Sequence, residues 1–289
     1  MANSIQLAKV YTNLLDEVYK QSALTAVLES DASLARQGAN ANEIIIPKLS
    51  MDGLADYSRN SGYVNGDVTL NWETVQFNYE RGRMFSVDNM DNEETQNIAF
   101  GRLAGEFIRT KVVPELDAFR FAKYAATEGA GVATGALASG ADVIAALRTA
   151  TSAMDEAEVP MEDRHLFITP TLLGLVEDMD TTKSKEVLSR FASITKVPQT
   201  RFYSAIELLD GKTPSEEKGG YKKADGGVEL NFEIIHKPAT LQFTKHAVPK
   251  VISPEQNQNA DAWKYGYRNY GLCDTYENKT AGIYVHKKA

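Results

Sequence analysis

Residues 80–94 read ERGRMFSVDNMDNEE, and this stretch marks the change from one kind of structure to another. Arg81 and Arg83 flank Gly82, a short apolar run follows, and acidic residues crowd together behind it. Side chains two residues apart on a strand point to the same face, so the two arginines are expected to act on one surface. Gly82 has no side chain, which permits a close backbone approach or a bulge at this point.

A long helix is predicted directly after this stretch, from about Asn92 to Thr127. Asp91 followed by Glu94 matches a capping box, with Asp91 at the cap, which leaves Asp88 as the first acid available to pair elsewhere. At ~1.5 Å per residue such a helix would be about 50 Å long. Pro114 is expected to kink it, because proline removes one backbone hydrogen bond. The apolar stripe of the helix consists of Leu103, Phe107, Val112, Leu116 and Phe119.

Two β-like runs precede the helix. The first is EIIIPKL, from Glu43 to Leu49, where Pro47 suggests an edge strand. The second runs from Val68 to Asp88, and a polar stretch with Asp-Gly and Asn-Gly turn signals separates the two. Together they predict one long two-stranded excursion. An isolated hairpin is marginally stable in water, so we expect support from outside its own domain.

A mixed α/β unit is predicted after the helix, over residues 142–236. A connector of small residues, GAGVATGALASGA (129–141), leads into it and is interpreted as a hinge. Its glycines do not follow a strand and do not have the spacing of a dinucleotide-binding loop. A polar loop is expected from Asp210 to Gly227, and the remaining tail alternates strands and turns.

Composition limits the possible functions of the chain. Its 289 residues are 43% hydrophobic and carry a net charge of −8, which disfavours tight binding of nucleic acid, since that binding requires cations. No apolar run is long enough to span a membrane. The N-terminal segment, Ile5 to Leu34, has helical apolar spacing, which fits either a core-facing helix pair or an arm whose apolar stripe contacts a partner.

The sequence lacks a convergent set of catalytic or metal-binding residues. None of the four histidines has a second ligand at the spacing that local zinc motifs require. His165 and His236 lie beside apolar strands and are interpreted as core residues. Cys273, the only cysteine, is expected to be a buried structural thiol. We therefore expect no enzyme activity and no cofactor.

The order of these segments resembles that of the major capsid proteins of tailed bacteriophages, which have the Hong Kong 97-like fold. The resemblance covers nearly the whole chain. It is carried by RGRMFSVDNMDNEET leading into KVVPELDAFRFAKYA, by VPQTRFYSAIELLDG before NFEIIHKPA, and by YGLCDTYENKTAGIYVH at the end. It implies an α+β shell-forming protein without a catalytic site. An encapsulin-like compartment, which shares the fold and encloses cargo enzymes, is the alternative.

The resemblance also implies a division of the chain. Its parts are an N-terminal arm (1–42), an extended loop (43–87), the spine helix of a peripheral domain (88–128), the hinge (129–141), an axial domain (142–238), and returning peripheral strands with a C-terminal strand (239–289). Fewer than about 45 residues precede the extended loop, from which we expect a separate scaffolding protein.

Further expectations about partners and location follow from the same resemblance. The chain would form pentamers and hexamers of a virion shell, assemble in the cytoplasm of the bacterial host, meet a portal, and touch packaged double-stranded DNA only weakly. No membrane is expected to take part. Some shells of this family are welded by a bond between a lysine of the extended loop and an asparagine of a neighbour. Here no lysine occurs between Lys48 and Lys111, so we expect no such bond.

The resemblance to shell-forming proteins suggests a role for the residues of the opening stretch. Arg81 and Arg83, together with Asp88, are predicted at a subunit interface, with the arginines paired to carboxylates of an adjacent subunit. A solvated strand end that contributes nothing measurable is the alternative, because most surface ion pairs are weak. A phosphate site is disfavoured, since acids lie within a few residues of both arginines.

Overall fold

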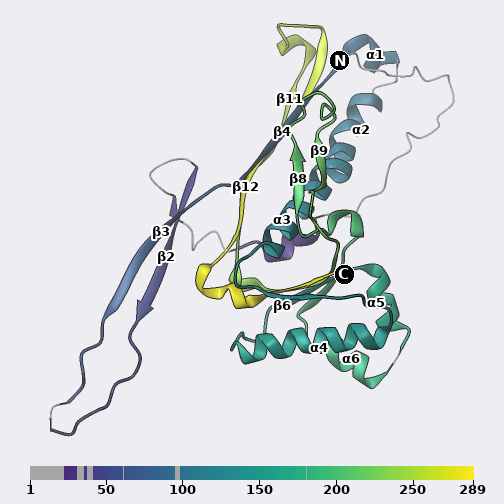
Figure 1. Ribbon diagram of the computed structural model, residues 1–289. Coiled ribbons are helices and arrows are strands. Elements are labelled where there is room, and N and C mark those ends of the chain that lie inside the picture. The colour runs from purple at the N-terminus through teal and green to yellow at the C-terminus, as the bar shows by residue number, and fades with distance from the viewer. Residues whose placement is uncertain (1–22, 31–35, 38–41, 61, 95–97, 180) are drawn as a thin grey trace.

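The computed structural model consists of an α/β unit, a helical spine, a three-stranded sheet and a projecting hairpin (Figure 1). The residues that it describes are 23–30, 36–37, 42–60, 62–94, 98–179 and 181–289. Most of the predicted helical segment Ile5–Leu34 therefore lies outside the described residues, and Leu24–Leu28 forms a short 3-10 helix. Within the described part of the chain, no helix has the length and apolarity to cross a membrane.

The α/β unit is built on a five-stranded sheet whose strands lie in the order β5-β13-β10-β6-β7. The strands are β5 (Gly131–Thr134), β6 (Arg164–Ile168), β7 (Ser193–Lys196), β10 (Leu230–His236) and β13 (Ile283–Lys287). The helices are α4 (Gly140–Glu156), α5 (Pro170–Glu177) and α6 (Thr182–Leu188). Every residue of the central strands β6 and β10 is buried, as expected for strands covered on both faces.

The two faces of this sheet pack against different partners. Phe232 and Ile234 of β10 contact the cluster that includes Leu147 of α4. Ile235, one residue further along, belongs to the opposite cluster with Phe121 of the spine. The alternation follows from the two-residue period of a strand. The sheet therefore joins the outer helices to the spine through a continuous core.

Two predicted boundaries around this unit need correction. The connector 129–141, predicted as a hinge, contributes strand β5, which pairs in parallel with β13 over residues 131–134. The C-terminal strand β13, which the division of the chain grouped with residues 239–289, lies between β5 and β10. The physical reason is that β13 is buried over Ile283–His286 and fills a central position that residues 142–238 leave open.

The spine consists of α1 (Asn89–Glu94), α2 (Ile98–Phe107), a π-helical turn (Ile108–Val112) and α3 (Val113–Ala125). The predicted irregularity is present one turn before Pro114, because proline cannot donate to the carbonyl four residues earlier and the preceding turn widens. The start differs from the prediction. The helix begins at Asn89, three residues before the predicted Asn92.

The three-stranded sheet runs beside the spine in the order β11-β12-β4. Its strands are β11 (Thr240–Ile252), β12 (Ala262–Thr275) and β4 (Tyr79–Asp88), all antiparallel to their neighbours. The tail predicted to alternate strands and turns begins with the single long strand β11, which has an irregularity between Thr244 and His246. Leu241, Phe243 and Leu272 pack beneath the sheet against Ile44 and Ile46.

The projecting hairpin consists of β2 (Glu43–Met51) and β3 (Val68–Gln76), and the two-residue strand β1 (Arg36–Gln37) lies along β2. Figure 1 shows it extending away from the body of the subunit. Strand β1 pairs with β2 only at Ile44 and Ile45. Among the described residues, Pro47 therefore has a neighbouring strand on one side only, which is β3. This edge position suits proline, which has no backbone N–H to donate to a second strand.

The predicted single run from Val68 to Asp88 is divided in the structure. Residues 68–76 pair with β2, whereas 79–88 pair with β12 as strand β4. Asn78 sets this division, because its side chain donates to the carbonyl of Cys273 (2.7 Å) and accepts from the amide of Cys273 (3.1 Å). The excursion predicted over 43–87 therefore ends at Gln76.

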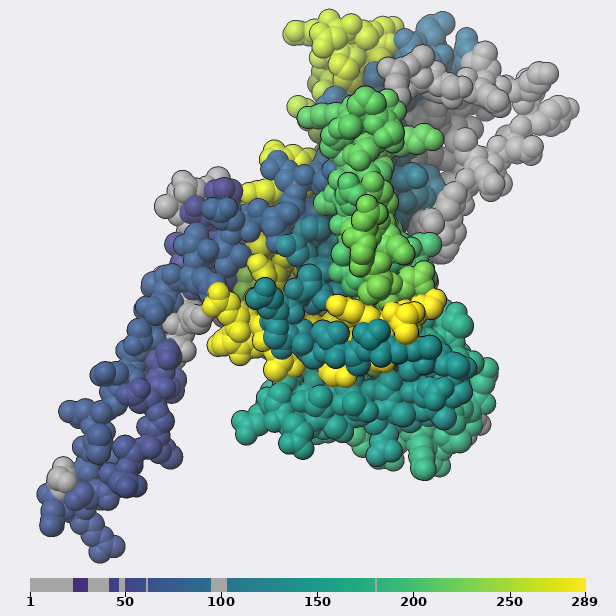
Figure 2. Space-filling model, in the orientation of Figure 1, coloured from purple at the N-terminus to yellow at the C-terminus, as the bar shows by residue number. Residues whose placement is uncertain are grey.

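A second hairpin, of β8 (Ile206–Leu209) and β9 (Gly220–Lys223), lies along the spine (Figures 1 and 2). The polar loop predicted from Asp210 to Gly227 therefore contains a strand. The remaining short 3-10 helices are Gln199–Arg201, Lys237–Ala239, Pro254–Gln256 and Glu277–Gly282.

Candidate functional site

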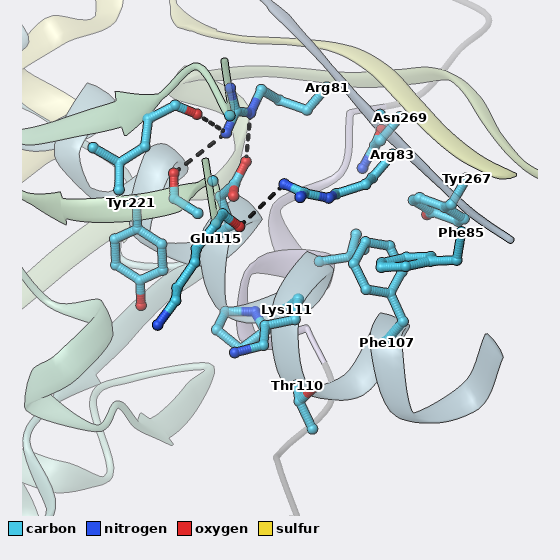
Figure 3. Close-up of a pocket in the computed structure, with 18 of the residues that line it drawn as sticks. Arg81, Arg83, Phe85, Phe107, Thr110, Lys111, Glu115, Tyr221, Tyr267 and Asn269 are labelled. Atoms are coloured by element: carbon cyan, nitrogen blue, oxygen red, sulfur yellow. Dashed lines mark hydrogen bonds and ion pairs between the residues drawn. The ribbon is translucent and has the colours of Figure 1, made fainter. Parts of the chain in front are cut away.

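A cleft of about 980 Å³ lies where β4, the spine and the β8–β9 hairpin meet (Figure 3). One wall is aromatic. Phe85 of β4 and Phe107 of α2 make an edge-to-face pair with ring centres 4.8 Å apart, and Tyr267 of β12 lies 6.4 Å from Phe107. The other wall is polar and contains both arginines of the opening stretch. The cleft is thus apolar on one side and rich in hydrogen-bonding groups on the other.

Arg81 connects three elements of the fold at the polar wall. Its Nε lies 2.8 Å from Oε1 of Glu115 on α3, and this ion pair is largely shielded from solvent. Its Nη2 donates to the carbonyl of Leu209 (2.7 Å) and to that of Gly220 (3.3 Å). Leu209 ends β8 and Gly220 begins β9, so one guanidinium binds both strands of the hairpin and the spine.

Glu115 also accepts a hydrogen bond from the hydroxyl of Tyr79, with an O–O distance of 3.2 Å. Burial and the neighbouring Glu115 carboxylate raise the pKa of Tyr79 well above its usual value. Tyr79 therefore stays a neutral donor at physiological pH. The carboxylate of Glu115 is held between a tyrosine and an arginine of the same strand, which fixes β4 against the spine.

Arg83 binds the loop that joins β8 to β9. Its Nη1 donates to the carbonyl of Lys218 (3.1 Å) and its Nη2 to the carbonyl of Glu217 (2.9 Å). Gly211 and Gly219 have φ angles of +72° and +63°, and a Cβ atom at these positions would lie 3.3 Å and 3.0 Å from Arg83 Nη1. Glycine thus supplies both the left-handed backbone and the space that the guanidinium occupies.

The same loop is organised internally by Asp210. Its carboxylate accepts from the amides of Lys212 (2.7 Å) and Thr213 (2.8 Å) and from the hydroxyl of Thr213 (2.6 Å). The hydrogen bonds from Thr213 and Lys212 lower the pKa of Asp210 to about 2. The loop therefore presents a defined set of backbone carbonyls to Arg83.

The structure confirms two of the sequence interpretations of the opening stretch and corrects a third. Both arginines point to one surface (Figure 3). Gly82 allows close approach, since a Cβ atom there would lie 2.9 Å from the carbonyl oxygen of Tyr267. Arg81 does bind a carboxylate, but it is that of Glu115 in the same chain, because the spine passes directly beneath β4.

Asp88 lies apart from the cleft, at the end of β4. Its Oδ1 accepts from the amide of Met90 at 2.9 Å, so Asp88 satisfies a free amide at the start of α1. The capping role predicted for Asp91 thus falls to Asp88, because the helix begins earlier than expected. The assignment of Arg81, Arg83 and Asp88 to a subunit interface stays a prediction.

A second polar centre lies deeper, and the sequence interpretation missed it. Asp117 of α3 accepts from Arg201 Nη1 (2.9 Å), from the hydroxyl of Thr25 (2.8 Å), and from the amides of Leu24 and Thr25. Arg120 donates to the Thr25 hydroxyl (3.0 Å). The signal was an acid within a buried segment of an apolar helix, since buried carboxylates require partners.

Two histidines and the cysteine lie in the interior of the subunit. His165 and His236 are buried, as predicted, and burial lowers the pKa of each imidazole. Cys273 is a buried thiol, also as predicted, and burial raises its pKa to about 12. Among the described residues, no group of three or more histidine, cysteine, aspartate or glutamate side chains is arranged to hold a metal ion.

Comparison with known proteins identifies the fold. No protein-family model and no curated protein sequence matches the chain. Solved structures do match it over nearly its full length. The mature capsid of bacteriophage PhiM1 aligns with a TM-score of 0.64 and 11% identity, covering 98% of this chain and 92% of that chain. The capsid structure of cyanophage P-SCSP1u aligns with a TM-score of 0.62 and 11% identity, covering 98% and 93%.

A virus-like particle from Pyrococcus furiosus also matches, with a TM-score of 0.54 and 10% identity, covering 91% of this chain and 97% of that chain. The identities are low, so what is shared is the fold. The chain has the fold of tailed-phage major capsid proteins, which is the Hong Kong 97-like fold predicted from the order of its segments.

Proposed function

We propose that this chain is a major capsid protein that assembles into the icosahedral head of a tailed bacteriophage. The observation that carries the proposal is the match of the whole fold, including the projecting hairpin, to phage capsid chains. In this role the protein is structural rather than catalytic. Its site of action is the virion, after assembly in the cytoplasm of the bacterial host.

The hairpin supplies a physical reason for self-assembly. Eight of the sixteen large hydrophobic side chains that are exposed in the described chain lie between residues 51 and 72. Leu54 and Tyr63 at the tip are 107% and 87% exposed. A concentration of apolar surface on a projecting element is a mark of an interaction site. A shell of repeated subunits would cover this surface with neighbouring copies.

The domain scheme given by the resemblance is part of the proposal, with boundaries adjusted to the elements described above. The extended loop would comprise residues 43–76. The axial domain would include β5 and β13 in addition to residues 142–238. The arm at 1–42, the spine from 88 to 128 and the peripheral strands from 239 keep their proposed roles.

The proposed partners are further copies of the chain in pentamers and hexamers, a separate scaffolding protein, a portal and packaged double-stranded DNA. Contact with DNA would be weak and non-specific, because a chain with a net charge of −8 offers few cations and a packaged genome must slide during ejection. No membrane is involved in this scheme.

Negative-stain microscopy of the protein, expressed alone and with the proteins encoded beside it, tests the proposal. Closed shells of uniform diameter are expected, and only amorphous aggregates or monomers under all conditions would refute it. An encapsulin-like compartment is the second candidate, favoured by the match to the Pyrococcus furiosus particle. Terminase and portal genes beside this one, with nuclease-protected DNA in native particles, would decide for the phage head. Enzyme cargo would decide for the compartment.

A further inference from the structure

The β8–β9 hairpin is attached to the subunit in two different ways along its length. At its base, Ile206 and Leu208 pack against the core shared by the spine and the five-stranded sheet. Its outer part lies across the cleft of about 980 Å³, which separates it from the spine. Hydrogen bonds rather than close packing therefore hold the outer part in place.

Most of these hydrogen bonds come from two residues of one strand. Arg81 and Arg83 donate four hydrogen bonds to backbone carbonyls of residues 209–220. Backbone acceptors are correctly placed only when the loop has its folded conformation, which Asp210 maintains. The arginines thus recognise the shape of the hairpin end, and Gly211 and Gly219 leave the space for Arg83.

Strand β4 has a special position in the chain. It follows directly on β3 of the projecting hairpin after residues 77–78, and it is bound to the spine through the Arg81–Glu115 pair. The β8–β9 hairpin belongs to the segment between β7 and β10 of the five-stranded sheet. Contacts between β4 and this hairpin therefore link the base of the projecting hairpin to the α/β unit.

We propose that Arg81 and Arg83 form a clasp that holds the β8–β9 hairpin against β4, and that the hairpin swings away as one unit when the clasp opens. Opening exposes the aromatic wall of the cleft, formed by Phe85, Phe107 and Tyr267. Elements with few apolar contacts and solvent-exposed hydrogen bonds open at lower free energy than the core, which makes a local rather than global transition the expected one. This inference concerns the single subunit and does not depend on the proposed function.

Hydrogen exchange measured by mass spectrometry on the purified subunit tests the clasp. Arg83 is the residue to change, because removal of Arg81 would also leave the Glu115 carboxylate without its ion pair. Arg83→Ala is expected to accelerate exchange in residues 206–223 by about 10-fold or more, since it removes both hydrogen bonds from this charged donor to the loop carbonyls. Exchange in β6 and β10 should stay as in the wild type.

Two further variants test whether the two-pronged hydrogen bonding of the Arg83 guanidinium, rather than its positive charge alone, holds the loop. Arg83→Lys keeps the charge but cannot bind both carbonyls in the same way, so it should also accelerate exchange in residues 206–223. Arg268→Ala removes an exposed ion pair with Glu80 on the same sheet and should leave these residues unchanged. Unchanged exchange in Arg83→Ala would overturn the proposal. Acceleration that spreads equally through β6 and β10 would overturn it as well.

The clasp can also be opened from the loop side. Gly219→Ala places a methyl group 3.0 Å from Arg83 Nη1. Gly220 has a φ angle of +91°, and the methyl group added by Gly220→Ala has no atom within 4 Å. Both variants strain the backbone, but only the first displaces the guanidinium. Faster exchange of residues 206–223 in Gly219→Ala than in Gly220→Ala is expected. Equal effects of the two substitutions would show that Arg83 does not hold the loop.

Discussion

Arg201 donates to Asp117 across 2.9 Å, and the two side chains are 3% and 0% exposed. Asp117 lies on the spine and Arg201 follows β7. The Asp117 carboxylate also accepts hydrogen bonds from the backbone amides of Leu24 and Thr25 in the N-terminal segment. Three parts of the chain that are far apart in sequence thus meet at one buried carboxylate. Its partners satisfy its charge, which a buried ion requires.

Removal of the Asp117 carboxylate is expected to destabilise the subunit strongly. Asp117→Ala removes the carboxylate that binds the buried Arg201 guanidinium and the Thr25 hydroxyl, and losing one partner of a buried pair costs about 3–5 kcal/mol. Urea unfolding followed by circular dichroism measures the change. Glu177→Ala, which breaks a half-exposed pair with Lys196, is the matched control and should change stability by less than about 1 kcal/mol. A loss for Asp117→Ala no larger than that of the control would contradict the assigned role.

Glu233 is expected to make stability depend on pH. It lies in the middle of β10, paired with Phe167 of β6 and Val285 of β13, and is fully buried. Its two carboxyl oxygens have no hydrogen-bond partner among the residues that the structure describes. Burial raises its pKa well above the usual 4.5. Because the folded-state pKa is the higher one, the contribution of Glu233 to stability is complete below pH 4.5. It is lost as pH rises from there to the folded-state pKa, because the unfolded chain ionises while the folded one stays protonated.

The measurement compares wild type with Glu233→Gln, which keeps the shape of the side chain without its ionisation. Above pH 4.5 the stability of the wild type relative to this variant should fall by up to about 1.4 kcal/mol per pH unit. Chemical denaturation from pH 5 to 8 gives both curves. Parallel curves over that range would mean that Glu233 is not buried in an apolar site.

The projecting hairpin is expected to be protected only in the assembled state. Residues 50–70 carry much of the exposed apolar surface, and a hairpin without cover is marginally stable in water. Hydrogen exchange should therefore be fast across these residues in free subunits and slow in shells. Strands β6 and β10 of the five-stranded sheet serve as the internal reference, since every residue of both is buried within the subunit. Equal protection of residues 50–70 in both states would rule out cover by neighbouring subunits.

The arginine pair is expected to influence assembly as well as the β8–β9 hairpin. The Arg81→Ala, Arg83→Ala double variant should fold with unchanged circular dichroism, because the backbone pairing of β4 with β12 does not depend on these side chains, yet assemble poorly at moderate salt. Light scattering of assembly reactions measures this, and Arg268→Ala is the control on the same sheet. Assembly of the double variant at the wild-type rate and yield would place the subunit interface elsewhere.

Mature particles are expected to lack covalent links between subunits. The hairpin has Lys48 in β2, and no further lysine follows before Lys111, so its tip offers no amine to a neighbour. Shells boiled in detergent should run as monomers on a denaturing gel. A ladder of covalent multimers would disprove the expectation.

The sequence by itself determined the type and order of most elements. The β-like runs at 43–49 and 68–88 and the helical stripe from Leu103 to Phe119 are local patterns, and they formed strands and a helix as predicted. The same local rules placed Arg81 and Arg83 on one face and left room beside Gly82. Local backbone and side-chain geometry fixes these features, and they do not depend on which other segments pack against the strand or helix.

Only the tertiary structure decided which segments became partners. Asn78 ended the hairpin because its side chain binds Cys273, 195 residues further along the chain. Strand β13 lies in the five-stranded sheet between strands that begin at residues 131 and 230. Glu115 and the loop carbonyls reached Arg81 and Arg83 through the packing of the spine and the β8–β9 hairpin. Contacts over such separations depend on how buried surfaces fit together in three dimensions, and a local pattern of residues carries no record of that fit.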